Sequence, residues 1–261
     1  MLSTSILYAN ASARIDTVRE TGEVSFSSVQ RDIDYFRENI KDVSGPEDIL
    51  GDYKLYSFVM TAFDLESQLN SRGLIRRIMT EDVNDDESLV NKLSNIQYKE
   101  FATKFSFAGQ GELSVSLQSR IEDVVDRYIT VRTEQREGEL SPGVRLALYF
   151  ERNAPKVESY FGLLGDRPLR EFVFTAFQFP DELNQLGAED LAAKLEERFA
   201  IEDLQDPEKR QQLIQRFSAL YDAENGLNVP SSPVVALAAP LSNAPQVFGI
   251  SAETLLSLRT F

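Results

Sequence analysis

One pattern, Phe-Val-x-Thr-Ala-Phe, occurs twice, as Phe58-Val59-Met60-Thr61-Ala62-Phe63 and, 114 residues later, as Phe172-Val173-Phe174-Thr175-Ala176-Phe177. Each copy places two Phe side chains and a small Ala on one face of a helix, where a second helix can approach closely. Other residues repeat at the same offset, without a gap. These are Phe36 and Asn39 with Phe150 and Asn153, Leu50-Gly51-Asp52 with Leu164-Gly165-Asp166, and Leu69-Asn70 with Leu183-Asn184. We therefore predict an internal duplication.

The pair Gly-Asp precedes the repeated stretch in both copies. Gly51 and Gly165 suit the end of a helix or a tight turn that needs positive φ. Asp52 and Asp166 are expected to cap the next helix, where a carboxylate favours the positive end of the helix dipole. A structural role explains all four residues, so the repeat itself predicts no chemistry.

Helical spacing of apolar residues runs through nearly the whole chain. Val29, Ile33, Phe36 and Ile40 form one such stripe. Further helices are predicted at 71–81, 86–107, 113–137, 142–161, 167–179, 188–200 and 206–224. Strand signals are weak: Val234 to Leu237 lies among proline residues. The sequence therefore predicts an all-α fold.

The longest predicted helix carries apolar residues at alternating steps of four and three. They are Leu117, Ile121, Val124, Tyr128 and Val131. This spacing is typical of a coiled coil, but it lasts only two heptads. A central helix packed on its neighbours is therefore favoured.

The repeat and the breaker residues divide the chain into five parts. They are an N-terminal segment (1–24), a first helical repeat (25–112), a long connecting helix (113–140), a second repeat (141–225), and an irregular Pro-rich linker with a terminal amphipathic helix (226–261). The expected architecture is an internally duplicated helical bundle with pseudo-twofold symmetry. Two separate globules are the alternative.

Both ends of the chain carry apolar side chains that could contact a partner. The terminal helix either docks on another protein or folds back on its own core, and the sequence favours neither. The candidate partner-binding residues are Ile6, Leu7, Tyr8, Ile250, Leu255, Leu256, Leu258 and Phe261.

The composition argues against several classes of function. The net charge of -15, from 42 acidic and 27 basic residues, repels phosphate backbones and anionic membranes and would suit a basic partner. The chain has no Cys and no His, which excludes Ser-His and Cys-His nucleophiles and the usual zinc sites. Asp82 begins an EF-hand-like pattern, but Glu87 and Leu93 stand where Gly and Glu are needed. Asp85 or Asp86 is instead expected to cap the next helix.

We therefore expect no enzymatic activity, no catalytic, cofactor-binding or metal site, and no small-molecule substrate. Arg76, Arg77 and Arg216 are interpreted as ion-pair partners on helix surfaces. The first residues lack the basic and apolar regions of a secretory signal, and no apolar run reaches the ~20 residues that span a bilayer. We expect a chain that does not insert into membranes and that is exported, if at all, without a signal peptide.

A set of short motifs resembles a bacterial family called domain of unknown function 1217. The likeness covers roughly residues 25–225, and the motifs are Asp32-x-x-Tyr35-Phe36-x-x-Asn39-Ile40, Asp52-Tyr53-x-Leu55, Ala62-Phe63-Asp64-Leu65, Leu74-Ile75-x-x-Ile78, Asn91-Lys92-Leu93, Tyr98-x-x-Phe101, Leu164-Gly165-Asp166-x-x-Leu169, Thr175-Ala176-Phe177 and Asp206-Pro207. The family's members are helical and are encoded among flagellar genes, and no enzymatic residues are established for it.

The resemblance implies a structural or assembly protein of the bacterial flagellum, associated with the basal body, rod or hook. Its partners would be flagellar proteins, with self-association as a further option, and it would be located on the periplasmic side. The alternative is a cytoplasmic regulator or export chaperone that binds a flagellar substrate. Neither end carries a recognisable rod, hook or filament signature.

Overall fold

The structure is a computed structural model that describes residues 2–21, 27–108 and 118–226. The described residues contain helices and turns but no β-strand, which confirms the predicted all-α fold. The Pro-rich arm, which includes Val234 to Leu237, lies outside these residues. The α-helices are α1 (Thr4–Thr21), α2 (Ser27–Asn39), α3 (Pro46–Gly51), α4 (Tyr53–Ala62), α5 (Arg72–Thr80), α6 (Leu89–Lys92), α7 (Ile96–Phe105), α8 (Gln118–Leu140), α9 (Pro142–Asn153), α10 (Tyr160–Gly165), α11 (Arg167–Phe177), α12 (Ala188–Glu196) and α13 (Pro207–Glu224).

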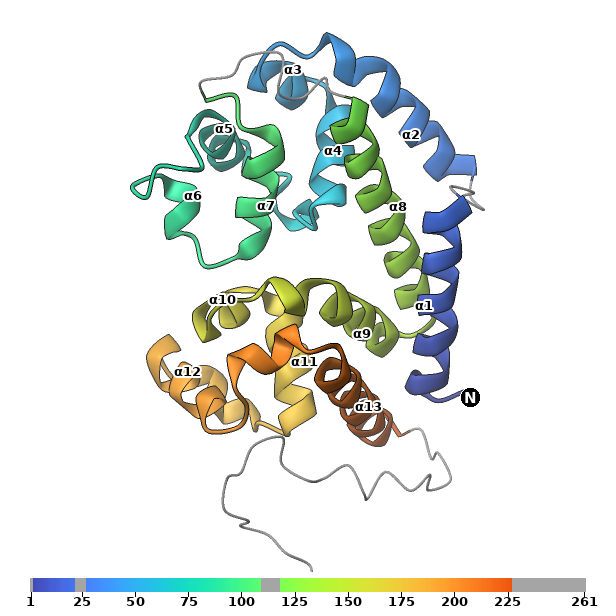
Figure 1. The fold of residues 1–261 in the computed structure, drawn as a ribbon, viewed down its shortest axis with the longest axis vertical. Coiled ribbons are helices and arrows are strands. Elements are labelled where there is room, and N and C mark those ends of the chain that lie inside the picture. The colour runs from blue at the N-terminus through green and yellow to red at the C-terminus, as the bar shows by residue number, and fades with distance from the viewer. Residues whose placement is uncertain (1, 22–26, 109–117, 227–261) are drawn as a thin grey trace, which may run out of the picture.

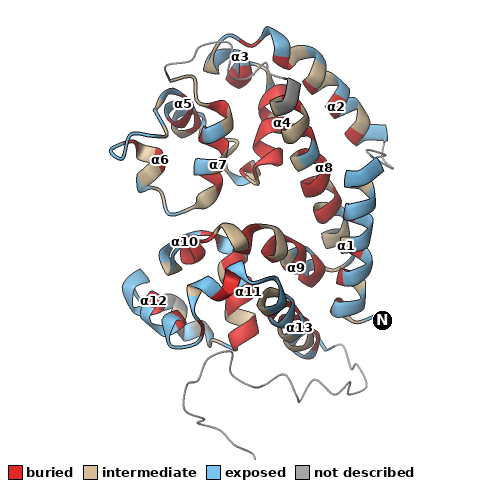
Figure 2. Cartoon of the chain, viewed as in Figure 1, coloured by how far each residue is buried: buried red, intermediate tan, exposed pale blue. Residues whose placement is uncertain are grey.

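The helices surround two hydrophobic cores, stacked along the long axis of the molecule (Figure 1). The first module, α2 to α8, encloses one core, and the second module, α9 to α13, encloses the other. Helix α8 runs along one side of the first module, and α9 follows it after a single residue. In both modules the buried residues lie on the helix faces that point inward (Figure 2).

The N-terminal helix α1 packs on the second module rather than standing apart. Tyr8, Ala11 and Ile15 are buried in the second core. The backbone N–H of Thr4 donates to the Asp222 carboxylate at 3.0 Å, which joins the first turn of α1 to α13. Because α1 also lies along α8, it contacts both modules (Figure 1).

Corresponding positions of the repeat have corresponding structures. Helices α3 and α10 begin and end 114 residues apart, and each core contains a stack of three rings. The stacks are Phe36–Phe58–Tyr128, with centroids 4.3 and 3.9 Å apart, and Phe150–Phe172–Phe217, with centroids 3.8 and 4.3 Å apart. The third ring comes from α8 in the first module and from α13 in the second, so these two helices occupy equivalent places.

The two Gly-Asp pairs confirm one expectation and correct another. Asp52 accepts hydrogen bonds from the backbone N–H groups of Lys54 and Leu55, and Asp166 accepts one from that of Leu169, so both cap a helix as predicted. Neither Gly51 nor Gly165 has positive φ. Positive φ occurs further on, at Asp64 (57°) and Gln178 (52°), where α4 and α11 end.

Two long predicted helices are broken, and each break has a local cause. The stretch 142–161 divides after Asn153, because Pro155 has no N–H to donate to a continuing helix. The stretch 86–107 divides into α6 and α7 with Asn95 as the N-cap of α7, because its side chain accepts from Gln97 N–H at 2.8 Å. The expected cap at Asp85 or Asp86 is wrong, since Ser88 precedes α6 and Asp85 accepts from Glu87 N–H instead.

Candidate functional site

A buried ionic triad joins the two modules. Arg152 on α9 donates from Nη1 to Asp64 at the end of α4, at 2.9 Å, and from Nε to Glu134 on α8, at 2.7 Å. The three side chains are 15%, 10% and 4% exposed. Burial alone would lower the pKa of Arg152, but the two carboxylates hold it well above its usual value. Arg152 therefore stays charged, and the triad links three helices.

A second buried network lies beside the triad. The Tyr149 hydroxyl donates to Asp166 Oδ2 at 2.7 Å and accepts from Gln97 Nε2 at 2.6 Å. Gln97 belongs to α7 of the first module, whereas the other two residues belong to the second. Burial raises the pKa of Asp166 more than its hydrogen bonds lower it, and burial likewise raises the pKa of Tyr149.

Shifted pKa values often mark catalytic groups, but structural ion-pair networks shift them too. Here each group is engaged by a partner on another element. Glu100 on α7 completes the pattern, because it accepts from Lys156 at 2.8 Å and from Arg127 at 3.1 Å. We interpret these networks as the joint that holds the modules in one arrangement.

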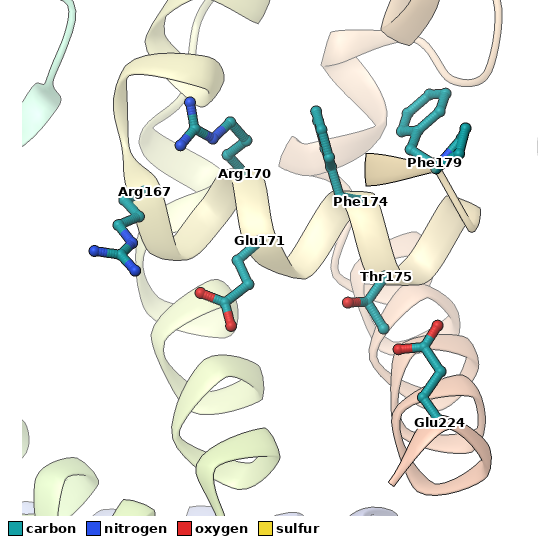
Figure 3. Close-up of a pocket in the computed structure, with 8 residues that line it drawn as sticks. Arg167, Arg170, Glu171, Phe174, Thr175, Phe179 and Glu224 are labelled. Carbon is teal, nitrogen blue, oxygen red and sulfur yellow. The ribbon is translucent and has the colours of Figure 1, made fainter. Parts of the chain in front are cut away.

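The surface offers a second kind of site, over the outer side of α11. A hollow of about 430 Å³ is lined by Arg167, Arg170, Glu171, Phe174, Thr175, Phe179, Pro180 and Glu224, a set that we call the α11 surface. Figure 3 shows Arg170, Phe174 and Phe179 projecting to one side, and Glu171 and Thr175 projecting to the other, on which Glu224 at the end of α13 also lies. Successive turns of one helix thus present guanidinium, carboxylate and phenyl groups together.

Two further arginines stack on rings next to the α11 surface. Arg198 lies 5.7 Å from the centroid of Phe179, and Arg216 lies 5.3 Å from that of Phe177. Burial and repulsion from Arg198 lower the pKa of Arg216. Arg216 was expected to form a surface ion pair, and this is wrong: among the described residues it pairs with a ring instead. Arg76 and Arg77 do form the predicted pairs, with Glu47 and Glu81.

None of four arginines here, Arg167, Arg170, Arg198 and Arg216, forms an ion pair with a described residue. Guanidinium groups held beside aromatic rings bind carboxylates and apolar side chains of other proteins well. Sequence reasoning missed this surface. Its only trace was the i, i+4, i+8 spacing of Arg167, Glu171 and Thr175, which any exposed helix face shows.

The predicted partner-binding residues lie in three different situations. The side chain of Ile6 is exposed and that of Leu7 is half-buried, but Tyr8 is only 6% exposed. Its hydroxyl accepts from Gln211 Nε2 at 2.9 Å, because α1 packs its apolar stripe against α9 and α13. The C-terminal candidates lie outside the described residues: Ile250, Leu255, Leu256, Leu258 and Phe261.

Two searches of the described residues concern membranes and metals. None of the described helices combines the length and the apolarity that crossing a membrane requires. Within the same part of the chain, the acidic residues nowhere form a group of three or more arranged to hold a metal ion.

Comparison with known proteins identifies relatives of this chain. Residues 62–209 match the family model described as protein of unknown function (DUF1217). The X-ray crystal structure of protein AGR_C_984 from Agrobacterium tumefaciens is similar, with 32% sequence identity and a TM-score of 0.76. The match covers 86% of this chain and 97% of that one. Among curated proteins none matches the sequence.

Proposed function

Because the chain belongs to the DUF1217 family of proteins of unknown function, we propose that it is a non-enzymatic structural or assembly protein of the bacterial flagellum. The flagellar setting is what the sequence resemblance to this family implies. The binding role is supported by one observation, the α11 surface, where arginines without carboxylate partners lie beside half-buried rings. Partners would be flagellar proteins that present a short segment with carboxylate and apolar side chains.

The chemistry of the α11 surface supports binding more than catalysis. Arginine and aromatic residues carry much of the energy in protein interfaces, because they bury large areas and arginine offers several hydrogen-bond donors in a planar group. On α11, Arg170 would bind a carboxylate of the partner, and Phe174, one turn later, would pack against an apolar side chain of the partner. Glu171 and Glu224 on the other side of the hollow would select its orientation.

Fractionation of motile cells tests the proposal. The full chain should sediment with detergent-washed basal bodies, and deletion of its gene should impair motility. The double variant Arg167→Glu, Arg170→Glu should lose the association, because two repulsive charges replace two attractive ones. The matched control, Arg31→Glu with Arg72→Glu, changes two exposed arginines on the first module and should keep it.

Two results would overturn the proposal. One is normal motility in the deletion strain, with the chain absent from basal bodies. The other is a chain that stays in the cytosol bound to export substrates, which would favour the regulator or export chaperone. Circular dichroism of each purified variant would establish that it is folded.

A further inference from the structure

Each module contains the same Tyr-Asp pair next to the same glycine. In the first module the Tyr35 hydroxyl donates to Asp52 Oδ2 at 2.6 Å. In the second module the pair is Tyr149 and Asp166, at 2.7 Å, and the glycines are Gly51 and Gly165. All three positions are related by the offset of 114 residues. The two modules therefore present one local surface twice.

In the second module this surface is covered by the N-terminal turn of α7. Gln97 Nε2 donates to Asp166 Oδ2 at 3.2 Å, and Ile96 packs against the second core. Ser94 lies so close that a Cβ added to Gly165 would be 2.7 Å from its Cβ. Gly165 is thus required by the close approach of a helix N-terminus, not by its own backbone conformation.

In the first module the same surface has no such cover among the described residues. A Cβ added to Gly51 would meet no atom of the described residues within 4 Å, and its φ is not positive, so the described fold around it does not require glycine. Tyr53 beside it is 64% exposed, so an aromatic ring is accessible to a partner at this face. A shallow hollow of about 170 Å³ adjoins Tyr35 and Tyr53.

At two positions the charge is reversed between the two surfaces, although Lys54 also lies over the ring of Tyr35 in the first module. In the second module Lys156 binds Glu100, one turn along α7 from Gln97. The counterpart of Lys156 in the first module is Asp42, and that of Arg152 is Glu38, both exposed. An occupant of the first-module surface should therefore carry a basic residue where α7 carries Glu100. The positive end of its helix dipole would also favour the carboxylate of Asp52.

We propose that the first-module face, formed by Tyr35, Glu38, Asp42, Gly51, Asp52 and Tyr53, binds the N-terminal turn of a basic helix from a protein partner. A small residue of that helix lies on Gly51. A side-chain amide or guanidinium at its third position donates to Asp52, and a Lys or Arg one turn later pairs with Asp42. This site is separate from the α11 surface, so either can fail without the other.

A peptide derived from α7, which covers the equivalent surface in the second module, tests this site on the intact protein. The probe is a fluorescent peptide of residues 92–105 in which Glu100→Lys supplies the basic residue. It should bind the full chain with a Kd below about 1 mM, and the unchanged peptide should bind at least about tenfold more weakly. Asp42→Lys in the protein should reverse this preference.

Substitution of Gly51 is the decisive test. Gly51→Leu fills the position that the partner must approach, and it should weaken binding at least about tenfold while leaving the fold intact. Gly73→Leu, at another exposed helical glycine with open space around it, is the matched control and should bind normally. The proposal would be overturned if the peptide did not bind, or if Gly51→Leu left its Kd unchanged. If the chain associates with itself and Gly51→Leu abolishes this association, the partner is a second copy of the chain and not another protein.

Discussion

Arg152 on α9 holds Asp64, 88 residues earlier in the chain, through a hydrogen bond of 2.9 Å that joins the two modules. Replacing Arg152 by Met should lower the free energy of unfolding by about 3–5 kcal/mol, because it leaves two carboxylates buried without a counter-charge. The control is Arg14→Ala, which breaks an ion pair to Glu137 whose arginine is 53% exposed. It should cost less than about 1 kcal/mol. Urea denaturation of both variants measures the difference, and equal costs would contradict the buried triad.

The two equivalent glycines should respond differently to the same substitution. Gly165→Ala should lower stability by about 1–3 kcal/mol, because the new Cβ meets Ser94, including its backbone carbonyl carbon at 3.2 Å. Gly51→Ala meets no described atom within 4 Å and should be neutral or stabilise by up to about 1 kcal/mol. Thermal unfolding of the two variants is the measurement. Combining Gly165→Ala with Ser94→Gly should restore part of the loss.

The two capping aspartates should have opposite effects on the pH dependence of stability. At Asp52, burial raises the pKa but is outweighed by hydrogen bonds from Tyr35 and from backbone N–H groups, so the pKa lies below the ordinary 3.8. Its contribution is present above pH 3.8 and is lost as the pH falls through the folded value. At Asp166 burial dominates, and the pKa lies above 3.8. The contribution of Asp166 to stability is then greatest below pH 3.8 and is lost as the pH rises through the pKa of the folded state.

Asn substitutions at these positions remove the titration but keep a capping side chain. As the pH rises toward 3.8, Asp52→Asn should therefore become less stable relative to wild type. As the pH rises above 3.8, Asp166→Asn should become more stable relative to wild type. Urea unfolding of the three proteins between about pH 2 and 7 would show the two trends. Trends of the same sign would contradict the difference in burial.

Substitutions of Tyr8 and Ile6 should distinguish a residue of the core from a residue of the surface. Tyr8→Ala should lower stability by about 3 kcal/mol, because it empties a place in the second core and removes the hydrogen bond from Gln211. Ile6→Ala, at a side chain that is half exposed, should change stability by less than about 0.5 kcal/mol. If Ile6 contacts a partner, its substitution should weaken binding without changing the melting temperature. The reverse pattern would show that α1 does not pack as described.

The helical class and most helix positions were predictable because they depend on local properties. Spacing of apolar residues predicts a helix whatever it packs against, and Asp52 and Asp166 cap helices through atoms two or three residues away. Breaks were harder to predict, since the apolar pattern continues across Pro155 and across the turn before α7. The α11 surface could not be predicted, because it combines residues of α11 and of the end of α13.

The sequence by itself determined that the chain is helical, that a stretch of it occurs twice and that each copy begins a helix with a Gly-Asp pair. These properties follow from side-chain spacing and backbone chemistry within a few residues. Only the tertiary structure decided that Asp166 is covered by Gln97 while Asp52 remains partly exposed, and that Tyr8 belongs to a core. Burial is the reason: whether a side chain meets solvent, a counter-charge or a ring depends on segments that lie far away in the chain. Two identical local motifs can therefore acquire opposite pKa shifts and different roles.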